Sequence, residues 1–159
     1  MDGIKTFKGE IIMNEYATKI ESVTHYFDDK KKKKLQTKIF IRLCNKLDET
    51  ENTDINKLIR DTFDLLQEYT RDESIKKTIY LKSFKALKKQ VREELGFTPK
   101  GLIQEEMTGM GIAIGVALGS AFVGINPAFI GIGLPIGLAI GASIGKRKEE
   151  QAESEGKTY

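Results

Sequence analysis

The spacing of apolar residues divides the chain into two different parts. Between residues 15 and 95, apolar side chains return every three or four positions among charged ones, as they do on amphipathic helices. Residues 107–145 instead form a run of 39 residues without one charged side chain. Because apolar runs longer than about 18 residues are typical of membrane spans, the pattern predicts a charged helical domain followed by a membrane segment.

Four helices are predicted in the amphipathic part. Their expected ranges are residues 15–27, 30–47, 53–69 and 72–95. Thr53 or Asp54 is expected to cap the third helix through its side-chain oxygen, and Gly96 and Pro99 prevent the fourth from continuing. The alternation that strands require is missing. The expected fold is therefore all-α, with a small four-helix bundle over residues 13–96.

The uncharged run has a turn signal near its middle. Asn126 and Pro127 form a turn dipeptide that separates two apolar halves. As a helix, each half would measure roughly 25 Å, a little less than the ~30 Å hydrocarbon core of a bilayer. We therefore expect a transmembrane helical hairpin over residues 107–145, joined to the bundle by a connector over residues 97–106. A re-entrant hairpin fits the same pattern.

Glycines repeat at every fourth position within both halves. They are Gly111, Gly115 and Gly119, then Gly133, Gly137, Gly141 and Gly145. This spacing places them on one face of a helix, where another backbone can approach closely. The two segments resemble the glycine zippers of small bacterial membrane proteins. The resemblance implies tight helix packing and homo-oligomerisation, in some cases with permeabilisation of the membrane. The residues alone leave open whether each half packs on the other half or on another chain.

Charge suggests how such a hairpin would be oriented. Residues 1–100 contain 22 Lys and Arg against 17 Asp and Glu. Lys146, Arg147 and Lys148 directly follow the uncharged run. The positive-inside tendency then places both ends in the cytoplasm. We expect the chain at the inner membrane, with residues 146–159 as a charged, disordered, cytoplasmic tail.

Two lysine-rich stretches precede the membrane segment. The fourth predicted helix carries a basic face made of Lys82, Lys85, Lys88, Lys89 and Arg92. This face is interpreted either as a contact for anionic lipid head groups or as a solvated surface. The block of lysines at residues 30–34 is interpreted first as a solvated helical turn and second as a binding site.

The first twelve residues are treated separately. Codons permitted at residues 8–13 include a bacterial ribosome-binding core followed by a start codon at Met13. Residues 1–12 are therefore expected to be untranslated or a disordered extension, and the source is expected to be an A/T-rich bacterium.

The sequence offers no constellation of catalytic or metal-binding residues. Cys44 is the only cysteine and His25 the only histidine, so neither a disulfide within the chain nor a Cys/His metal cluster is expected. No phosphate-binding glycine loop ending in Lys-Ser or Lys-Thr is present. We expect a protein that is not an enzyme and has no cofactor.

Three functions remain, in order of preference. The first is a hairpin that packs and oligomerises in the lipid bilayer and permeabilises it, as a toxin or defence effector. The alternative is a membrane-tethered module whose helical domain binds a cytoplasmic protein. The third is a soluble nucleic-acid-binding helical domain, which ranks last because no recognised binding motif accompanies the basic charge.

Overall fold

The computed structural model describes residues 13–48, 52–72, 77–124, 126 and 128–159. In these residues all regular secondary structure is helical, which confirms the all-α class predicted from the sequence. The chain divides into two compact units. The N-terminal unit covers Met1–Leu95 and the C-terminal unit covers Gly96–Tyr159.

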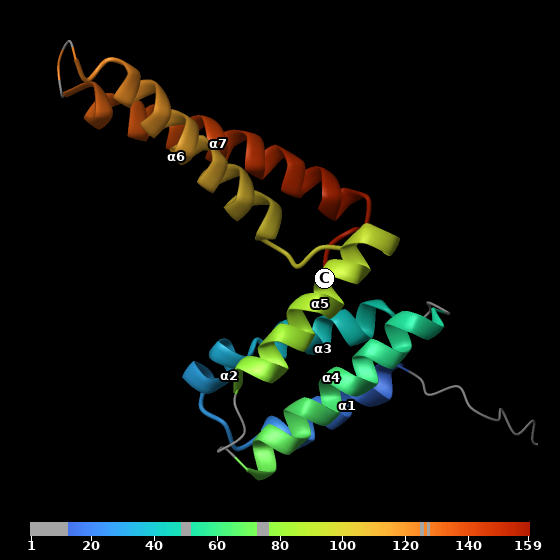
Figure 1. Ribbon diagram of the computed structural model, residues 1–159. Helices are drawn as coiled ribbons and strands as arrows, with labels where there is room; N and C mark the ends of the chain where they lie inside the picture. The colour runs from blue at the N-terminus through green and yellow to red at the C-terminus, as the bar shows by residue number, and fades with distance from the viewer. Residues whose placement is uncertain (1–12, 49–51, 73–76, 125, 127) are drawn as a thin grey trace, which may run out of the picture. The chain divides into compact units, whose positions relative to one another are not determined.

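The described part of the N-terminal unit contains five helices (Figure 1). They are α1 (Met13–Thr24), α2 (Asp29–Leu35), α3 (Thr37–Lys46), α4 (Thr53–Arg71) and α5 (Lys77–Leu95). Helix α1 packs against α3 and α4, and α4 packs against α5. All five contribute buried side chains, among them Ile20, Leu35, Phe40, Leu66 and Phe84. The Phe40 and Phe84 rings lie 4.9 Å apart, so α3 and α5 also meet in this core.

The second predicted helix, over residues 30–47, is in fact two helices. Gln36 separates α2 from α3 and has the left-handed backbone conformation, with φ +55°. The Tyr80 hydroxyl on α5 donates a hydrogen bond of 2.9 Å to the carbonyl of Leu35, the last residue of α2. Lys88, also on α5, donates to Gln36 Oε1 at 2.7 Å. These two contacts from α5 stabilise the break between α2 and α3. The described part of the N-terminal unit therefore has five helices where four were expected.

Other helix ends differ from the expected ones by a few residues. Helix α1 ends at Thr24, although Phe27 beyond it is buried. The cap of α4 is Asn52, whose Oδ1 accepts from the backbone N–H groups of Asp54 and Ile55 at 3.1 Å. Residues 1–12 and 73–76, for which an extension and the start of the fourth helix were predicted, lie outside the described residues.

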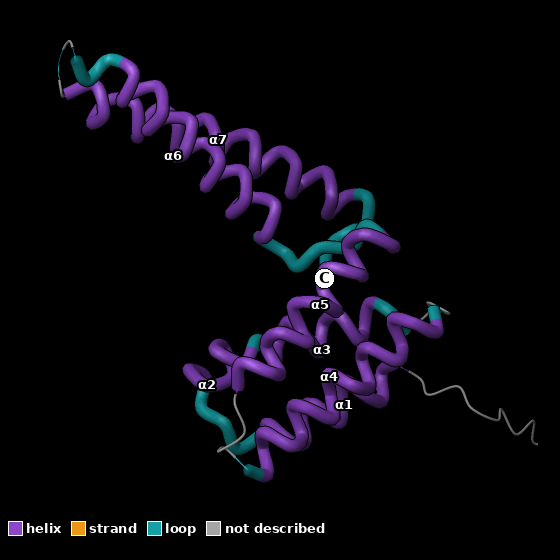
Figure 2. Tube along the Cα trace, viewed as in Figure 1, coloured by secondary structure: helices purple, strands orange, loops and turns teal. Residues whose placement is uncertain are grey.

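The C-terminal unit is a pair of long helices. Helix α6 (Leu102–Ala121) and helix α7 (Ala128–Ser154) lie side by side and run in opposite directions (Figure 2). Asn126 lies between them, and its Oδ1 accepts from the N–H of Ala128 at 2.9 Å. Pro127, the other predicted turn residue, lies outside the described residues. Helix α6 begins at Leu102, so half of the expected connector over residues 97–106 is helical.

The expected disordered tail over residues 146–159 is corrected by the structure. Helix α7 continues to Ser154, and Gly156, with φ +66°, follows its end. Beyond it the chain returns to the start of the unit, where Thr98 N–H donates to the carbonyl of Lys157 at 2.9 Å and Tyr159 N–H donates to that of Thr98 at 3.1 Å. The tail is ordered because its Lys, Glu, Ala and Gln residues favour helix and because Tyr159 is buried.

Cys44 lies in the core of the N-terminal unit, and its side chain has no exposed surface. Burial raises the pKa of its thiol from the usual 9.0 to about 12. Tyr80 is buried beside it, and burial followed by the proximity of Cys44 raises the pKa of its hydroxyl as well. Both groups therefore keep their protons in the folded unit at pH values where the unfolded chain loses them.

We predict that the N-terminal unit loses stability as the pH rises above about 9. In the unfolded chain the Cys44 thiol ionises near its ordinary pKa of 9.0. Unfolding then releases a proton, so the free energy of unfolding falls by up to about 1.4 kcal/mol per pH unit. Urea unfolding of the full chain in detergent, followed by tyrosine circular dichroism between about pH 8 and 10, measures this slope. Cys44→Ala should flatten it, and a stability of wild type that is constant with pH would contradict the prediction.

Candidate functional site

The predicted glycines lie where α6 and α7 touch. Gly111, Gly115 and Gly119 on α6 are buried, as are Gly137, Gly141 and Gly145 on α7, and Gly133 is partly buried. A β-carbon built on Gly137 would lie 2.8 Å from the Cα of Gly115, and one on Gly115 would lie 3.1 Å from the Cα of Gly137. The first distance is shorter than real Cβ contacts, and a β-carbon on Gly115 would also collide with the carbonyl oxygen of Gly133. The two backbones therefore pack directly on each other, and the partner of each helix is the other half of the same chain.

Other glycines of these two helices lie outside this contact. A β-carbon built on Gly109 or Gly131 would meet no other atom within 4 Å, apart from its own local helix. The glycines of the four-residue series are therefore packed between the helices, whereas Gly109 and Gly131, which lie outside the series, are not. Gly109 and Gly131 provide matched controls for substitutions in the contact.

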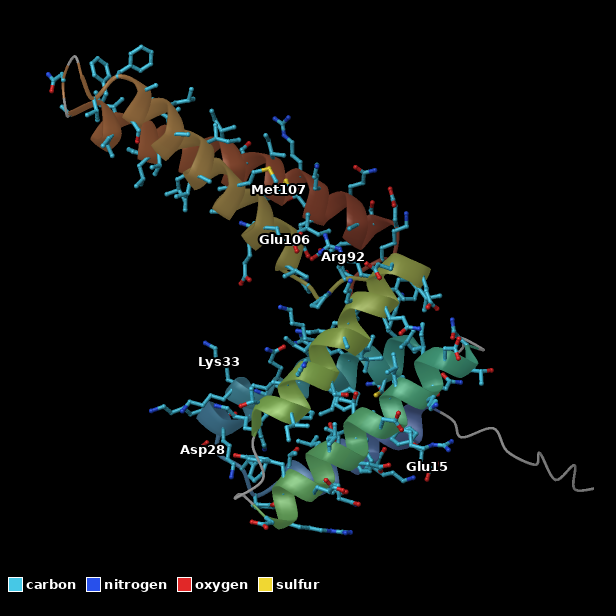
Figure 3. All side chains as sticks on the ribbon, in the orientation of Figure 1. Glu15, Asp28, Lys33, Arg92, Glu106 and Met107 are labelled. Carbon is cyan, nitrogen blue, oxygen red and sulfur yellow. The ribbon has the colours of Figure 1, made fainter. Side chains whose placement is uncertain are left out.

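Large apolar side chains of the pair point outward. Fourteen of them are exposed: Met110, Ile114, Val116, Leu118, Phe122, Val123, Phe129, Ile130, Ile132, Leu134, Ile136, Leu138, Ile140 and Ile144. Figure 3 shows side chains projecting away from both helices. The C-terminal unit is thus the reverse of the N-terminal one, because its small residues lie inside and its large apolar residues lie outside. Soluble monomers rarely expose an apolar surface of this extent.

The apolar surface is continuous. A groove of about 210 Å³ follows part of the contact between the helices. It is lined by Gly111, Gly115, Gly119, Gly133 and Gly137, together with Ile114, Leu118, Phe122, Phe129, Ile132, Ile136 and Ile140. Residues 107–145 contain only four polar side chains, those of Thr108, Ser120, Asn126 and Ser143. The Ser120 hydroxyl donates to its own helix, at the carbonyl of Val116. The described part of residues 107–145 therefore has no polar face.

One of the two helices meets the requirements for a membrane span. By length and composition, α7 is long and apolar enough to cross a membrane, and among the helices of the described residues it alone is. Helix α6 carries Glu105 and Glu106 in its first turns, which leaves a shorter apolar stretch.

A buried carboxylate on α7 contacts the backbone at the start of α6. Glu149 on α7 is buried, with 6% of its surface exposed. Its Oε1 accepts from the N–H of Gly101 at 2.7 Å, and its Oε2 accepts from those of Ile103 and Gln104 at 3.1 and 3.3 Å. Gly101 precedes α6 and has no side chain to cap it. Glu149 satisfies N–H groups that a helix start leaves without partners.

Sequence reasoning missed Glu149, which was assigned to a solvated tail. A signal was nevertheless present, because Glu149 is the next position in the four-residue series that ends at Gly145. One further step reaches Glu153, whose Oε1 lies 3.0 Å from Lys100 Nζ. The same face of α7 therefore carries first the glycine contacts and then two acidic contacts to the start of the unit.

The basic residues singled out from the sequence have different surroundings. Lys82, Lys85, Lys89 and Arg92 are exposed on α5, whereas Lys88 is half-buried. Burial, and then the neighbouring charge of Lys85, lowers the pKa of Lys88. Lys146, Arg147 and Lys148 are exposed on α7. Lys88 thus contacts Gln36 within the N-terminal unit, whereas Lys89 pairs with Glu93 on its own helix and Lys146 with Glu150 on α7.

Comparison with protein-family models, with curated proteins and with solved structures gave no match. The function is therefore argued from the geometry of this chain alone.

We predict that Glu149→Ala frees the start of α6. The N–H groups of Gly101, Ile103 and Gln104 would lose their acceptor, at a cost of about 1–3 kcal/mol. Hydrogen exchange of these three amides in the full chain should become about tenfold faster or more. The control is Glu150→Ala, because Glu150 is exposed and its carboxylate lies 3.9 Å from Lys146 Nζ. Equal exchange in the two variants would rule out the capping role of Glu149.

Proposed function

We propose that the α6–α7 pair is embedded in a lipid bilayer, where it tethers the N-terminal unit to the membrane and associates with further copies of the chain. The observation that carries the proposal is the reversed packing of the pair, with glycines inside and fourteen large apolar side chains outside. In water this surface would oppose folding. In hydrocarbon it matches its surroundings, and the helical backbone satisfies its own hydrogen bonds.

The distribution of charge supports a hairpin that enters from one side. The start of α6 carries Glu105 and Glu106, and the last turns of α7 carry Lys146, Arg147 and Lys148. Because the helices run in opposite directions, these residues share one end of the pair. The other end holds Asn126 and two phenylalanines, Phe122 and Phe129, whose rings lie 5.7 Å apart. The positive-inside tendency places the charged end at the cytoplasmic face of the inner membrane.

Association between chains would use the outer faces of the helices. The seven contact glycines are already packed within the chain, so they are not open to a second copy. A second series of small residues, Gly109, Ala113, Ala117 and Ala121, is exposed on α6, and Gly131, Ala139 and Ser143 are exposed on α7. In lipid, small residues let helices approach until dispersion contacts hold them together. We therefore propose the outer small residues as the oligomerisation face, in place of the glycine series named from the sequence.

The geometry favours tethering and association over permeabilisation. An aqueous pore needs a polar lining, and the four polar side chains of residues 107–145 do not form a stripe along the described helices. Leakage of dye from vesicles that depended on the α6–α7 pair would instead support the permeabilising effector.

We predict that membranes retain the chain through the outward side chains. Wild type should stay in the membrane fraction through high salt and alkaline carbonate. Ile114→Lys with Ile136→Lys should release it, since each lysine near the centre of a span costs about 2.5–3.5 kcal/mol. The matched control, Ile114→Leu with Ile136→Leu, should be retained. Extraction of the wild type by carbonate would overturn the proposal.

We predict that the inner and outer small residues can be separated by mutation. Gly115→Ala should destabilise the helix pair by about 1–3 kcal/mol, because its methyl group would collide with the backbone of α7. Gly109→Ala should leave the pair intact or stabilise it by up to ~1 kcal/mol. Thermal unfolding in detergent measures both effects.

Larger substitutions test association directly. Gly109→Leu with Ala117→Leu should weaken association between chains while leaving the pair folded. Cross-linking in vesicles at several ratios of protein to lipid measures this. If only substitutions at the contact glycines changed the oligomer, association would not use the outer face.

A further inference from the structure

The N-terminal unit has a hollow lined by lysines, far in sequence from the helix pair. It measures about 280 Å³ and is lined by Lys30, Lys31, Lys34 and Lys77, with Asp28, Leu35 and Tyr69. Three of the lysines lie on α2, and Lys77 begins α5. The fold thus brings together four ammonium groups and one carboxylate from separate parts of the sequence.

The arrangement of these lysines is fixed by buried contacts. Leu35 ends α2 and is fully buried, and its carbonyl accepts from Tyr80, one turn after Lys77 on α5. This hydrogen bond of 2.9 Å ties the end of α2 to the start of α5. Lys31 Nζ lies 3.9 Å from the centre of the Phe27 ring and 5.6 Å from that of the Tyr69 ring. Leu35 and Tyr69 therefore line the hollow beside its charged residues.

Contacts within the fold do not neutralise most of the lysine charges around this hollow. Asp28 is occupied as the cap of α2, where its Oδ1 accepts from the N–H of Lys31 at 2.6 Å. For Lys30, Lys34 and Lys77 the structure records no ion pair or hydrogen bond of the side chain with any described residue. Lys30 and Lys34 are four positions apart on one helix, where like charges repel. Unpaired lysines converging from two helices are an arrangement that an anion would stabilise.

We propose that this hollow binds a phosphate-bearing anion. Lysine ammonium groups act on phosphate as point charges from several directions, and the hollow offers this from both α2 and α5. The phosphate belongs either to a lipid head group or to a free small molecule, and the chemistry is the same. The inference goes beyond the proposed membrane function and can be tested whether or not that function holds.

The test measures protection of lysines in the full chain, reconstituted in nanodiscs of phosphatidylcholine. An amine-reactive reagent labels exposed lysines, and peptide mass spectrometry gives the rate at each. Two probes are compared: pyrophosphate in solution, and replacement of part of the lipid by phosphatidylglycerol. We expect slower labelling of Lys30, Lys34 and Lys77, and no change at Lys57, which is exposed on α4.

A pair of variants with equal loss of charge completes the design. Lys34→Gln with Lys77→Gln should weaken binding by about tenfold or more, since hydrogen bonds to charged groups are lost. Lys57→Gln with Arg60→Gln, on α4, should bind as wild type does. Circular dichroism checks that both variants are folded.

Each outcome is decisive. Protection by pyrophosphate identifies a site for free phosphate groups, and protection by phosphatidylglycerol alone identifies the lipid head group. Protection by neither probe overturns the inference. Equal binding by the two variants would also overturn it. Failure of membrane retention would not overturn the inference, because the pyrophosphate measurement can be made in detergent.

Discussion

Direct contact between the backbones of α6 and α7 is the constraint on which the C-terminal unit depends. At Gly115 and Gly137 there is no room for even a β-carbon. Helices this close can bury little side-chain volume between them, so the large apolar residues must project outward. The close contact and the apolar exterior are therefore two consequences of one sequence pattern. In water the exterior would oppose the fold, whereas in hydrocarbon the contact alone has to hold the helices together.

In the N-terminal unit the all-α class was predictable from the sequence, but the break between α2 and α3 was not. Leu35, Ile39 and Leu43 are spaced by four, which suits one continuous helix. The break at Gln36 leaves this spacing unchanged, so periodicity could not reveal it. Glutamine is also not a usual residue for the left-handed conformation, which glycine and asparagine adopt more readily. The break depends on contacts from α5, and contacts between distant segments are not visible in a local pattern.

The sequence predicted only part of the candidate site, because contacts between separate segments are again not visible in a local pattern. Spacing alone placed the seven glycines on one face of each helix, and the structure puts that face in contact. Spacing could not say which backbone lies opposite each glycine face. Glu149 was missed because its charge suggested solvent, although it continues the same series. A charge at the end of an apolar helix can also serve as an acceptor for a neighbouring helix start.

Packing the glycines within one chain separates folding from association. If the glycine face joined different chains, diluting the protein in lipid would take the helices apart. In this chain the close contact is intramolecular, so it does not depend on concentration, and the pair can form before any second copy is met. The association proposed above would then rely on small residues such as Gly109 and Ala117, where the gain is dispersion contact without a hydrophobic driving force. Association of this kind responds to the density of the protein in the membrane, whereas the helix pair does not.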